Sequence, residues 1–186
     1  MRTIALITGA TSGIGKATAL LLAKNNFDVI ITGRRKKLLI ELQEQIKQKS
    51  NSKVLSMCFD IRNSSEVDEA YQSIPSEWKN ISLLINNAGL AAGLDPIQSA
   101  SLSDWERMID TNVKGLLYIT RHVSKKMVEK GEGQIINISS IAGKEAYANG
   151  SVYCATKHAV EAITKSMRLD LLKHNIKVGS ISPGMV

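Results

Sequence analysis

Aromatic residues are scarce in this chain of 186 residues, where phenylalanine, tryptophan and tyrosine together make up 4%. The chain is nevertheless basic, with a formal net charge of +7. A protein that binds nucleic acid gathers its basic residues on one stripe and offers aromatic rings for stacking. Here the lysines are spread over the expected helices, among them Lys36, Lys47, Lys125 and Lys130. We therefore predict that no nucleic acid binds, that most of this charge is solvated helix surface, and that the remainder attracts an anionic cofactor or substrate.

Cysteines, metal-ligand clusters and long apolar runs are also rare or absent. Cys58 and Cys154 form no C-x-x-C motif, which favours buried packing roles, reduced thiols and a cytoplasmic location, and no metal site is expected. No apolar run approaches the roughly 20 residues that cross a bilayer, so no membrane interaction is expected. His122, His158 and His174 lack partners at a catalytic spacing and are predicted to be surface residues. A Gly-x-Ser-x-Gly elbow, typical of serine hydrolases, is missing too.

Short apolar segments alternate with longer amphipathic ones along the whole chain. Strands are expected at residues 3–7, 28–32, 53–59, 83–85, 134–139 and 177–181. Helices are expected at 14–25, 36–49, 65–73, 102–130 and 152–174, with a break in the fourth near Asn112. This alternation predicts an α/β fold: one dinucleotide-binding domain over residues 1–186, built as a Rossmann-like, doubly wound parallel sheet of six strands with helices on both faces.

The first expected strand continues directly into a glycine-rich segment, residues 8–15, with the sequence TGATSGIG. Strand, glycine-rich turn and helix form the layout in which main-chain N–H groups at a helix start receive a pyrophosphate. The spacing Gly-x-x-x-Gly-x-Gly differs from the common Gly-x-Gly-x-x-Gly. A P-loop is excluded because Ala10 and Ala17 replace its first glycine and its Mg²⁺-binding hydroxyl. The segment therefore predicts a dinucleotide-binding turn.

The end of the second expected strand lacks the acidic residue that usually binds the ribose 2′-hydroxyl of NAD. Arg34 and Arg35 stand there instead, and Asp28 lies at the opposite end of the strand. The basic run 34–37 opens a helix, where the macrodipole disfavours cations unless an anion binds nearby. A 2′-phosphate held by arginines fits this need, so we predict NADP as the cofactor. A solvated basic turn is the alternative.

Tyr153 and Lys157 are four residues apart in an expected helix and therefore lie on one face of it. A tyrosine has a reference pKa of about 10 and exchanges protons poorly near neutral pH. A cation one turn away stabilises the phenolate and lowers that pKa. The pair suits proton transfer between an alcohol and a carbonyl compound, although the same spacing also occurs on ordinary helix faces.

Polar or small residues directly follow each expected strand. They are Thr8–Gly9, Gly33–Arg34, Asp60, Asn86–Asn87, Ser139–Ser140 and Ser182–Pro183. In a doubly wound sheet, ligands bind beyond the carboxyl ends of the strands. These residues are therefore expected to form a single site.

Together these motifs resemble the classical short-chain dehydrogenase/reductase family over essentially the whole chain. The matching residues are 8–15, Asp60, 86–89, Asn112, Ser140, Tyr153, Lys157, Pro183 and Gly184. Segments 33–35, 87–94 and 104–112 are most similar to NADP-dependent 3-hydroxy acid dehydrogenases, which oxidise serine-like β-hydroxy acids. The resemblance implies an enzyme that transfers a hydride between NADP and a small alcohol or carbonyl compound, such as serine. A catalytically silent NADP-binding redox sensor and an inactive fragment are the alternatives.

The resemblance also implies roles for individual residues. Tyr153 exchanges the proton, Lys157 lowers its pKa and binds the nicotinamide ribose, Ser140 orients the carbonyl, and Asn112 holds a water that relays protons from Lys157 to solvent. Ser139 is the second choice for the role of Ser140.

The cofactor is expected to bind at seventeen positions. They are Gly9, Thr11, Ser12, Gly13, Ile14, Gly15, Arg34, Arg35, Asp60, Ile61, Asn87, Ala88, Gly89, Tyr153, Lys157, Pro183 and Gly184. Asp60 and Ile61 would contact the adenine, with a turn-capping role as the alternative for Asp60. Asn87 is favoured for the cofactor and Asn86 for a structural role.

Members of this family continue beyond the turn at 182–184 into a segment that covers the substrate and a further strand. Relative to them, the chain is expected to be incomplete at its C-terminus, which leaves the sixth strand at an edge. The apolar surface of helices 102–130 and 152–174 predicts a homo-oligomer, a dimer or a homotetramer.

Overall fold

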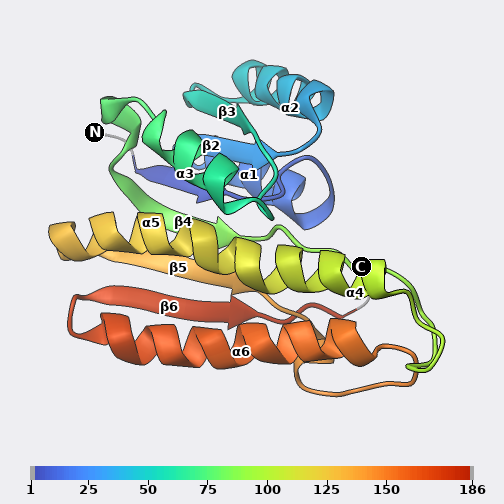
Figure 1. The fold of residues 1–186 in the computed structure, drawn as a ribbon. Coiled ribbons are helices and arrows are strands. Elements are labelled where there is room, and N and C mark those ends of the chain that lie inside the picture. Colours follow the sequence, from blue (N-terminus) through green and yellow to red (C-terminus); the bar gives the residue numbers. More distant parts are fainter. Residues whose placement is uncertain (1–2, 185–186) are drawn as a thin grey trace.

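Six short strands form one parallel sheet in the computed structural model of the protein, which describes residues 3–184 (Figure 1). The strands are β1 (Ile4–Ile7), β2 (Asp28–Gly33), β3 (Val54–Cys58), β4 (Ile81–Asn86), β5 (Gly133–Ile138) and β6 (Ile176–Ile181). Their order in the sheet is β3-β2-β1-β4-β5-β6. The direction of winding reverses between β1 and β4, which is where a doubly wound sheet opens a crevice for ligands. The predicted fold class is confirmed.

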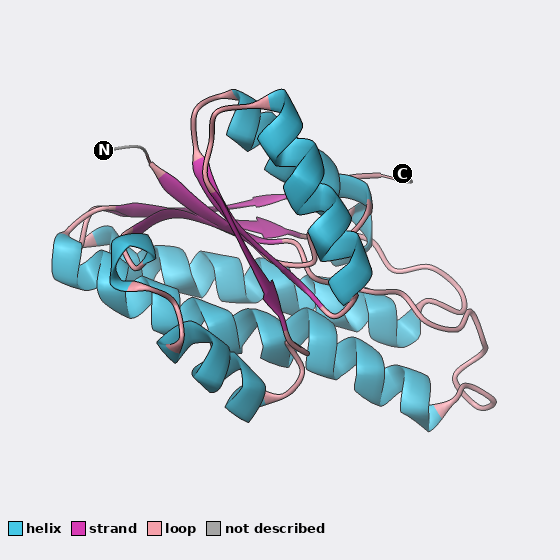
Figure 2. Ribbon diagram, turned by 90° about the horizontal axis from the view of Figure 1, so that it is seen from above, coloured by secondary structure: helices cyan, strands magenta, loops and turns pink. Residues whose placement is uncertain are grey.

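Helices connect the strands and agree with the predicted ranges to within two residues at every end outside the break near Asn112. They are α1 (Gly13–Lys24), α2 (Lys36–Lys49), α3 (Ser64–Gln72), α4 (Leu102–Ile109), α5 (Leu116–Lys130) and α6 (Ser151–Leu172). A short 3-10 turn (Ser76–Trp78) precedes β4 and another (Ile141–Gly143) follows β5. Seen from above, the sheet is twisted and has helices on both sides (Figure 2).

The long helix predicted over residues 102–130 is interrupted where the sequence indicated. A π-helical turn, Asp110–Gly115, joins α4 to α5 and contains Asn112. Such a turn accommodates one extra residue and is frequent at functional sites. Its buried residues are Thr111, Asn112 and Gly115, so the irregularity faces the protein interior.

Two apolar layers hold the helices against the sheet. On one face, Ala19 and Ala23 of α1 and Leu39 of α2 pack with Ile7 and Ile31. The opposite face carries the larger cluster, whose fully buried members include Leu6, Ile30, Leu84, Ile119 and Val123. Burial at about 25 cal/mol per Å² makes these two layers the main stabilising term of the fold.

The strand β6 lies at one edge of the sheet formed by residues 3–184. On the side that carries α1 and α2, its Gly179 faces open space and its Ile181 is 52% exposed. Among the described residues, no helix has both the length and the apolar character needed to cross a membrane.

Two of the sequence predictions about single residues are wrong. Cys154 is buried as expected, but Cys58 is exposed, because it is the last residue of the edge strand β3. His122 is not a solvated surface residue. Its Nε2 lies 2.6 Å from Oδ1 of Asp68 on α3, and its ring stacks on Tyr71. The contact arises because α3 and α5 pack side by side, and the spacing of residues along the chain does not predict it.

Candidate functional site

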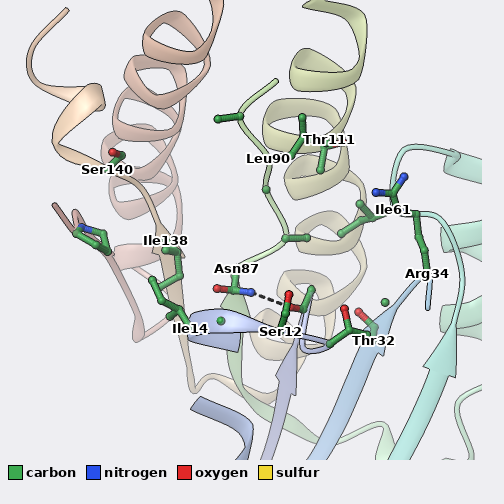
Figure 3. A pocket seen from close by; sticks show the side chains of 18 of the residues that line it. Ser12, Ile14, Thr32, Arg34, Ile61, Asn87, Leu90, Thr111, Ile138 and Ser140 are labelled. Carbon is green, nitrogen blue, oxygen red and sulfur yellow. Dashed lines mark hydrogen bonds between the residues drawn. The ribbon is translucent and has the colours of Figure 1, made fainter. Parts of the chain in front are cut away.

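A cavity of about 1040 Å³ opens at the carboxyl ends of the strands. The predicted site residues that line it are Gly9, Thr11, Ser12, Gly13, Ile14, Arg34, Arg35, Asp60, Ile61, Asn87, Ala88, Gly89, Ser140, Tyr153, Lys157, Pro183 and Gly184. The cavity extends from Arg34 and Ile61 on one side to Ser140 and Ile138 on the other, with Asn87, Ser12 and Ile14 between them (Figure 3). Of the predicted residues, only Gly15 and Asn112 lie outside the lining.

The glycine-rich turn brings the main chain close to its neighbours and leaves one position open. Gly9 has a φ of +64°, and a Cβ there would lie 2.8 Å from the Cα of Ala88. A Cβ on Gly15 would collide with the side-chain amide of Asn87 and the main-chain oxygen of Gly9. Gly13, in contrast, has a φ of +53° and nothing within 4 Å of its Cβ position. Gly15 therefore serves close packing, while Gly13 faces the cavity.

The start of α1 offers main-chain donors to an anion. Ser12 precedes the helix and makes no side-chain capping bond, and the first turn contains no acidic residue. The first N–H groups of a helix lack partners within it, and the dipole makes this end positive. An anionic group in the cavity is thus the natural partner of this helix end.

Thr8 was expected at the site but was given no role of its own, and the structure shows that it organises the turn. Its Oγ1 accepts hydrogen bonds from the N–H groups of Asn87 and Ala88, both at 3.0 Å. The Nδ2 of Asn87 donates to the main-chain oxygens of Thr8 at 2.9 Å and Gly9 at 3.1 Å. Asn87 therefore ties the turn after β4 to the turn after β1, in addition to lining the cavity (Figure 3).

Asn86 has the structural role that the sequence favoured. Its side chain is 3% exposed, and its Nδ2 donates to Thr120 Oγ1 at 2.8 Å and to Asn137 Oδ1 at 2.9 Å. Asn137 in turn donates to Thr164 Oγ1 at 2.8 Å. This buried chain of hydrogen bonds joins β4 and β5 to α5 and α6.

The two arginines after β2 have different surroundings. Arg35 donates from Nη2 to Thr11 Oγ1 at 2.6 Å and to Ser12 Oγ at 2.8 Å, so its guanidinium lies against the glycine-rich turn. Arg34 is half exposed, with its Nη1 3.6 Å from Oδ2 of Asp60. No acidic residue occupies the first turn of α2, which begins directly after Arg35. The carboxyl end of β2 is therefore strongly cationic.

Asp60 is held by Arg62, a residue that sequence reasoning missed. Arg62 donates to both carboxylate oxygens, from Nε at 3.0 Å and from Nη2 at 2.6 Å. Partial burial raises the pKa of the Asp60 carboxyl, but the hydrogen bonds and charge of Arg62 outweigh this and leave the pKa below its ordinary value. In the sequence, the signal for this contact was the Asp-x-Arg spacing. Arg62 thus orients the carboxylate of Asp60, which lines the cavity.

Lys157 and Tyr153 share one face of α6, as their spacing predicted. The Nζ of Lys157 lies 5.8 Å from the centroid of the Tyr153 ring and donates to the main-chain oxygen of Ile138 at 3.0 Å. Lys157 is 7% exposed, and this burial lowers its pKa to about 8. The ammonium is thus desolvated, which strengthens its attraction for any negative charge that develops nearby.

Ser140 lies beyond β5, on the same side of the cavity as Ile138 (Figure 3). Its Oγ accepts from the N–H of Ala142 at 3.2 Å, which leaves its hydroxyl hydrogen available to donate. Ser139 also lines the cavity, but its hydroxyl is buried and neighbours the Glu161 carboxylate, whose pKa it helps to lower. Ser140 is therefore the better placed donor.

The side chain of Asn112 is committed to protein contacts. Its Oδ1 accepts from the N–H of Leu90 at 2.9 Å, and its Nδ2 donates to the oxygen of Leu90 at 2.9 Å and to Thr156 Oγ1 at 3.0 Å. Only one lone pair on Oδ1 is left for the water that the sequence interpretation placed there. A Cβ on Gly89 would lie 3.3 Å from this Oδ1 and 3.6 Å from Lys157 Nζ, so Gly89 keeps that space open.

Comparison with known proteins places this geometry in a family. The family model of short chain dehydrogenases matches residues 3–186. The chain belongs to the short chain dehydrogenase family. It is 45% identical over 183 residues to the NADP-dependent 3-hydroxy acid dehydrogenase YdfG of Salmonella typhi, which covers 98% of this chain and 72% of that protein.

Solved structures of this family have the same fold. The crystal structure of serine dehydrogenase from Escherichia coli superposes with a TM-score of 0.94 at 44% identity, covering 99% of this chain and 83% of that one. The closed form of serine dehydrogenase complexed with NADP⁺ also gives 0.94 at 44% identity, covering 98% of this chain and 72% of that one. The family model and both structures cover nearly the whole chain, so the family resemblance predicted from the sequence motifs is confirmed for this short chain dehydrogenase.

Proposed function

We propose that this short chain dehydrogenase is an NADP-dependent oxidoreductase that interconverts a small 3-hydroxy acid, such as serine, and the corresponding carbonyl compound. The observation that carries the proposal is the arrangement of one cavity. Ser140 and Ile138 lie at one end of it and Arg34 lies at the other (Figure 3). Lys157, which shares a helix face with Tyr153, donates to the main-chain oxygen of Ile138 at the first end, and Arg35 follows Arg34 at the second. A group for proton transfer and a group for phosphate recognition are thus separated along a single elongated site.

The residues around the cavity fit a 2′-phosphorylated dinucleotide. The open space at Gly13 and the uncapped start of α1 suit the pyrophosphate. The cationic end of β2, with Arg34 half exposed, suits the 2′-phosphate. Asp60 and Ile61 would flank the adenine, and Lys157, Pro183 and Gly184 would hold the nicotinamide end. When bound, the nicotinamide supplies or accepts the hydride at the reacting carbon.

The protein's own residues handle the proton and the oxygen. Tyr153 gives its phenolic proton to the carbonyl oxygen in the reduction direction and takes it back in the oxidation direction. Lys157, desolvated beside the ring, stabilises the phenolate that remains. Ser140 donates its hydroxyl hydrogen to the same oxygen and so stabilises the negative charge that develops there. Asn112 fixes Leu90 and Thr156, and thereby the wall next to Lys157.

The proposed substrate class rests on the similarity to 3-hydroxy acid and serine dehydrogenases. The test is a spectrophotometric screen at 340 nm of NADP⁺ reduction with serine and other 3-hydroxy acids, and of NADPH oxidation with the matching aldehydes and 3-oxo acids. Simple alcohols serve as controls. Tyr153→Phe, which removes only the hydroxyl, should lower kcat by about 10²–10⁴-fold while NADPH binding persists.

A catalytically silent NADP-binding redox sensor is the competing function. It predicts tight NADPH binding without turnover of any substrate in the screen, together with a conformational difference between the NADP⁺ and NADPH forms. An active protein whose Tyr153→Phe variant keeps its rate would contradict the proposed mechanism, although not the family.

We further propose that residues 1–186 form one dinucleotide-binding domain that acts as a homo-oligomer, a dimer or a tetramer, in the cytoplasm. Exposed apolar side chains on the connecting helices support the assembly. They are Ile109, Leu117, Leu169 and Leu172. The location is proposed from the low cysteine content, because two cysteines without a C-x-x-C motif are typical of proteins in a reducing compartment. Sedimentation velocity at several protein concentrations tests the oligomeric state.

A further inference from the structure

Two segments meet at the reacting end of the cavity. The segment after β5 carries Ser140, and the segment after β6 carries Pro183 and Gly184, all of which line the cavity. Two main-chain hydrogen bonds join these segments, from Ser139 N to Ile181 O at 2.8 Å and from Ile141 N to Pro183 O at 3.0 Å. A displacement of one segment is therefore transmitted to the other.

One carboxylate connects this pair of segments to α6. Glu161 lies on α6, eight residues after Tyr153, and is half buried. Its Oε2 accepts from Ser180 Oγ at 3.0 Å, and its Oε1 accepts from Ser182 Oγ at 3.0 Å. One hydroxyl comes from β6 and the other from the turn that follows it. Each carboxylate oxygen thus holds a different point of the same segment.

The carboxylate is suited to this contact because it stays ionised. Partial burial raises the pKa of the Glu161 carboxyl. The hydroxyls of Ser139, Ser182 and Ser180 and the charge of Lys144 outweigh this burial and leave the pKa below its ordinary value. Hydrogen bonds to an ionised acceptor are about twice as strong as neutral ones. Two such bonds on one side chain fix the turn more firmly than main-chain contacts at an edge strand alone.

We propose that Glu161 is a positioning residue: it locks the turn at 182–184 against the helix that carries Tyr153 and Lys157, and through that turn it sets the place of Ser140. The inference rests on the proposed function and deepens it. Glu161 itself does not line the cavity. It determines whether the proton donor on α6 and the oxygen-binding hydroxyl on the neighbouring segment face the same reacting atom.

The experiment compares Glu161→Ala, Glu161→Gln and the double variant Ser180→Ala/Ser182→Ala in the full chain. Asp170→Asn is the matched control, because Asp170 is an exposed acidic residue on the same helix. Dissociation constants are measured for NADPH, which would occupy the whole cavity under the proposed function, and for adenosine 2′,5′-bisphosphate, which would reach only the arginine end. Steady-state kcat and KM and the melting temperature complete the set.

Glu161→Ala and the serine double variant should both bind NADPH at least fivefold more weakly while their affinity for adenosine 2′,5′-bisphosphate stays within twofold of the parent. The kcat of both should fall at least tenfold, with a smaller change in substrate KM. Glu161→Gln keeps one acceptor oxygen for one serine, and its NH₂ group can donate to the hydroxyl oxygen of the other. This variant should therefore retain most of the NADPH affinity and kcat that Glu161→Ala loses. The control should match the parent.

Equal weakening of both ligands together with a lower melting temperature would overturn the proposal, because it would mean a general loss of structure. Parent-like NADPH binding and turnover in Glu161→Ala would overturn it as well. If the parent itself shows no turnover with any substrate, the proposed function fails, yet the two binding constants still decide the role of Glu161.

Discussion

The side-chain amide of Asn112 pairs with both main-chain polar groups of Leu90, accepting from its N–H and donating to its oxygen, each at 2.9 Å. A side chain on the π-helical turn thus substitutes for the strand or helix partner that Leu90 lacks. Asn112 thereby ties the segment after β4, where Leu90 lines the cavity, to the turn between α4 and α5. Its loss would leave two polar groups of Leu90 without partners at once.

We therefore expect Asn112→Ala to lower the free energy of unfolding by about 1–3 kcal/mol, since unmade hydrogen bonds of buried groups cost roughly this amount. Urea unfolding of the cofactor-free protein measures the change. Thr156→Val is the control and should cost less, because it removes the third partner of Asn112 and the bond from the Thr156 hydroxyl to the main-chain oxygen of Tyr153 but leaves both bonds to Leu90. An Asn112→Ala variant as stable as the parent would show that the loop after β4 is fixed by other contacts.

Replacing Arg34 by aspartate should shift cofactor preference from NADP toward NAD. The new carboxylate would accept a hydrogen bond from the 2′-hydroxyl of NAD, whereas it would repel a 2′-phosphate. A lost charge-assisted contact of about 1.5–3 kcal/mol corresponds to a roughly 10- to 100-fold drop in kcat/KM with NADPH. Measuring kcat/KM with both cofactors checks this. Equal values for the parent protein would speak against NADP as its cofactor.

The burial of Lys157 predicts a pH-dependent stability of the cofactor-free protein. Its pKa is lowered to about 8 in the folded state, so the unfolded state binds more protons between pH 8 and the ordinary pKa of 10.5. Stability rises with pH wherever the unfolded state binds more protons. The cost of the buried ammonium is therefore complete below pH 8 and disappears as the pH rises toward 10.5.

Lys157→Met should accordingly raise the free energy of unfolding near pH 7, by up to roughly 3 kcal/mol. The difference in free energy of unfolding between Lys157→Met and the parent should shrink as the pH rises from 8 to 10.5. Urea titrations at pH 7, 8, 9 and 10 follow the difference, with Lys165→Met as the control because Lys165 is exposed on the same helix. A difference that is constant over this pH range would mean that Lys157 does not titrate there.

Two glycines of the turn after β1 should respond differently to alanine. In Gly15→Ala the new methyl group collides with Asn87 and Gly9, so we expect a loss of about 1–3 kcal/mol in stability. In Gly13→Ala the methyl group enters open space, and the cost is the left-handed backbone at about 1–2 kcal/mol plus obstruction of the bound anion. Thermal melts with and without NADPH separate the effects: stabilisation by NADPH should persist in Gly15→Ala and be reduced in Gly13→Ala.

Most of the fold was predictable because all strands of a parallel sheet end at the same edge, so the place of a residue in the chain indicates its place in the sheet. Each strand begins as an apolar run and ends at the same edge, so residues that follow the strands, such as Gly9, Arg34 and Ser140, had to converge. The pairing of Tyr153 with Lys157 followed from helical spacing alone. The break at Asn112 was predicted because a polar side chain there interrupts a long helical pattern.

The remaining features depend on which segments meet in space, and this carries no periodic signal. The contact of Lys157 with Ile138 and the contacts of Glu161 with two serines are of this kind. Exposure of Cys58 depends on the place of β3 at the edge, whereas residue type favours burial. For the same reason, His122 found a partner on α3 that lies 54 residues away.

The π-helical turn at Asp110–Gly115 also sets the phase of everything that follows it. Helix α5 carries Ile119 and Val123 into the core and presents Thr120 to Asn86. Because the turn absorbs one extra residue as a bulge, the helix after it keeps the phase that points this apolar stripe at the sheet. A regular α-helical turn with the same number of residues would rotate α5 by about 100° and turn the stripe toward water. The extra residue is therefore compatible with the core only because the winding is irregular at this point.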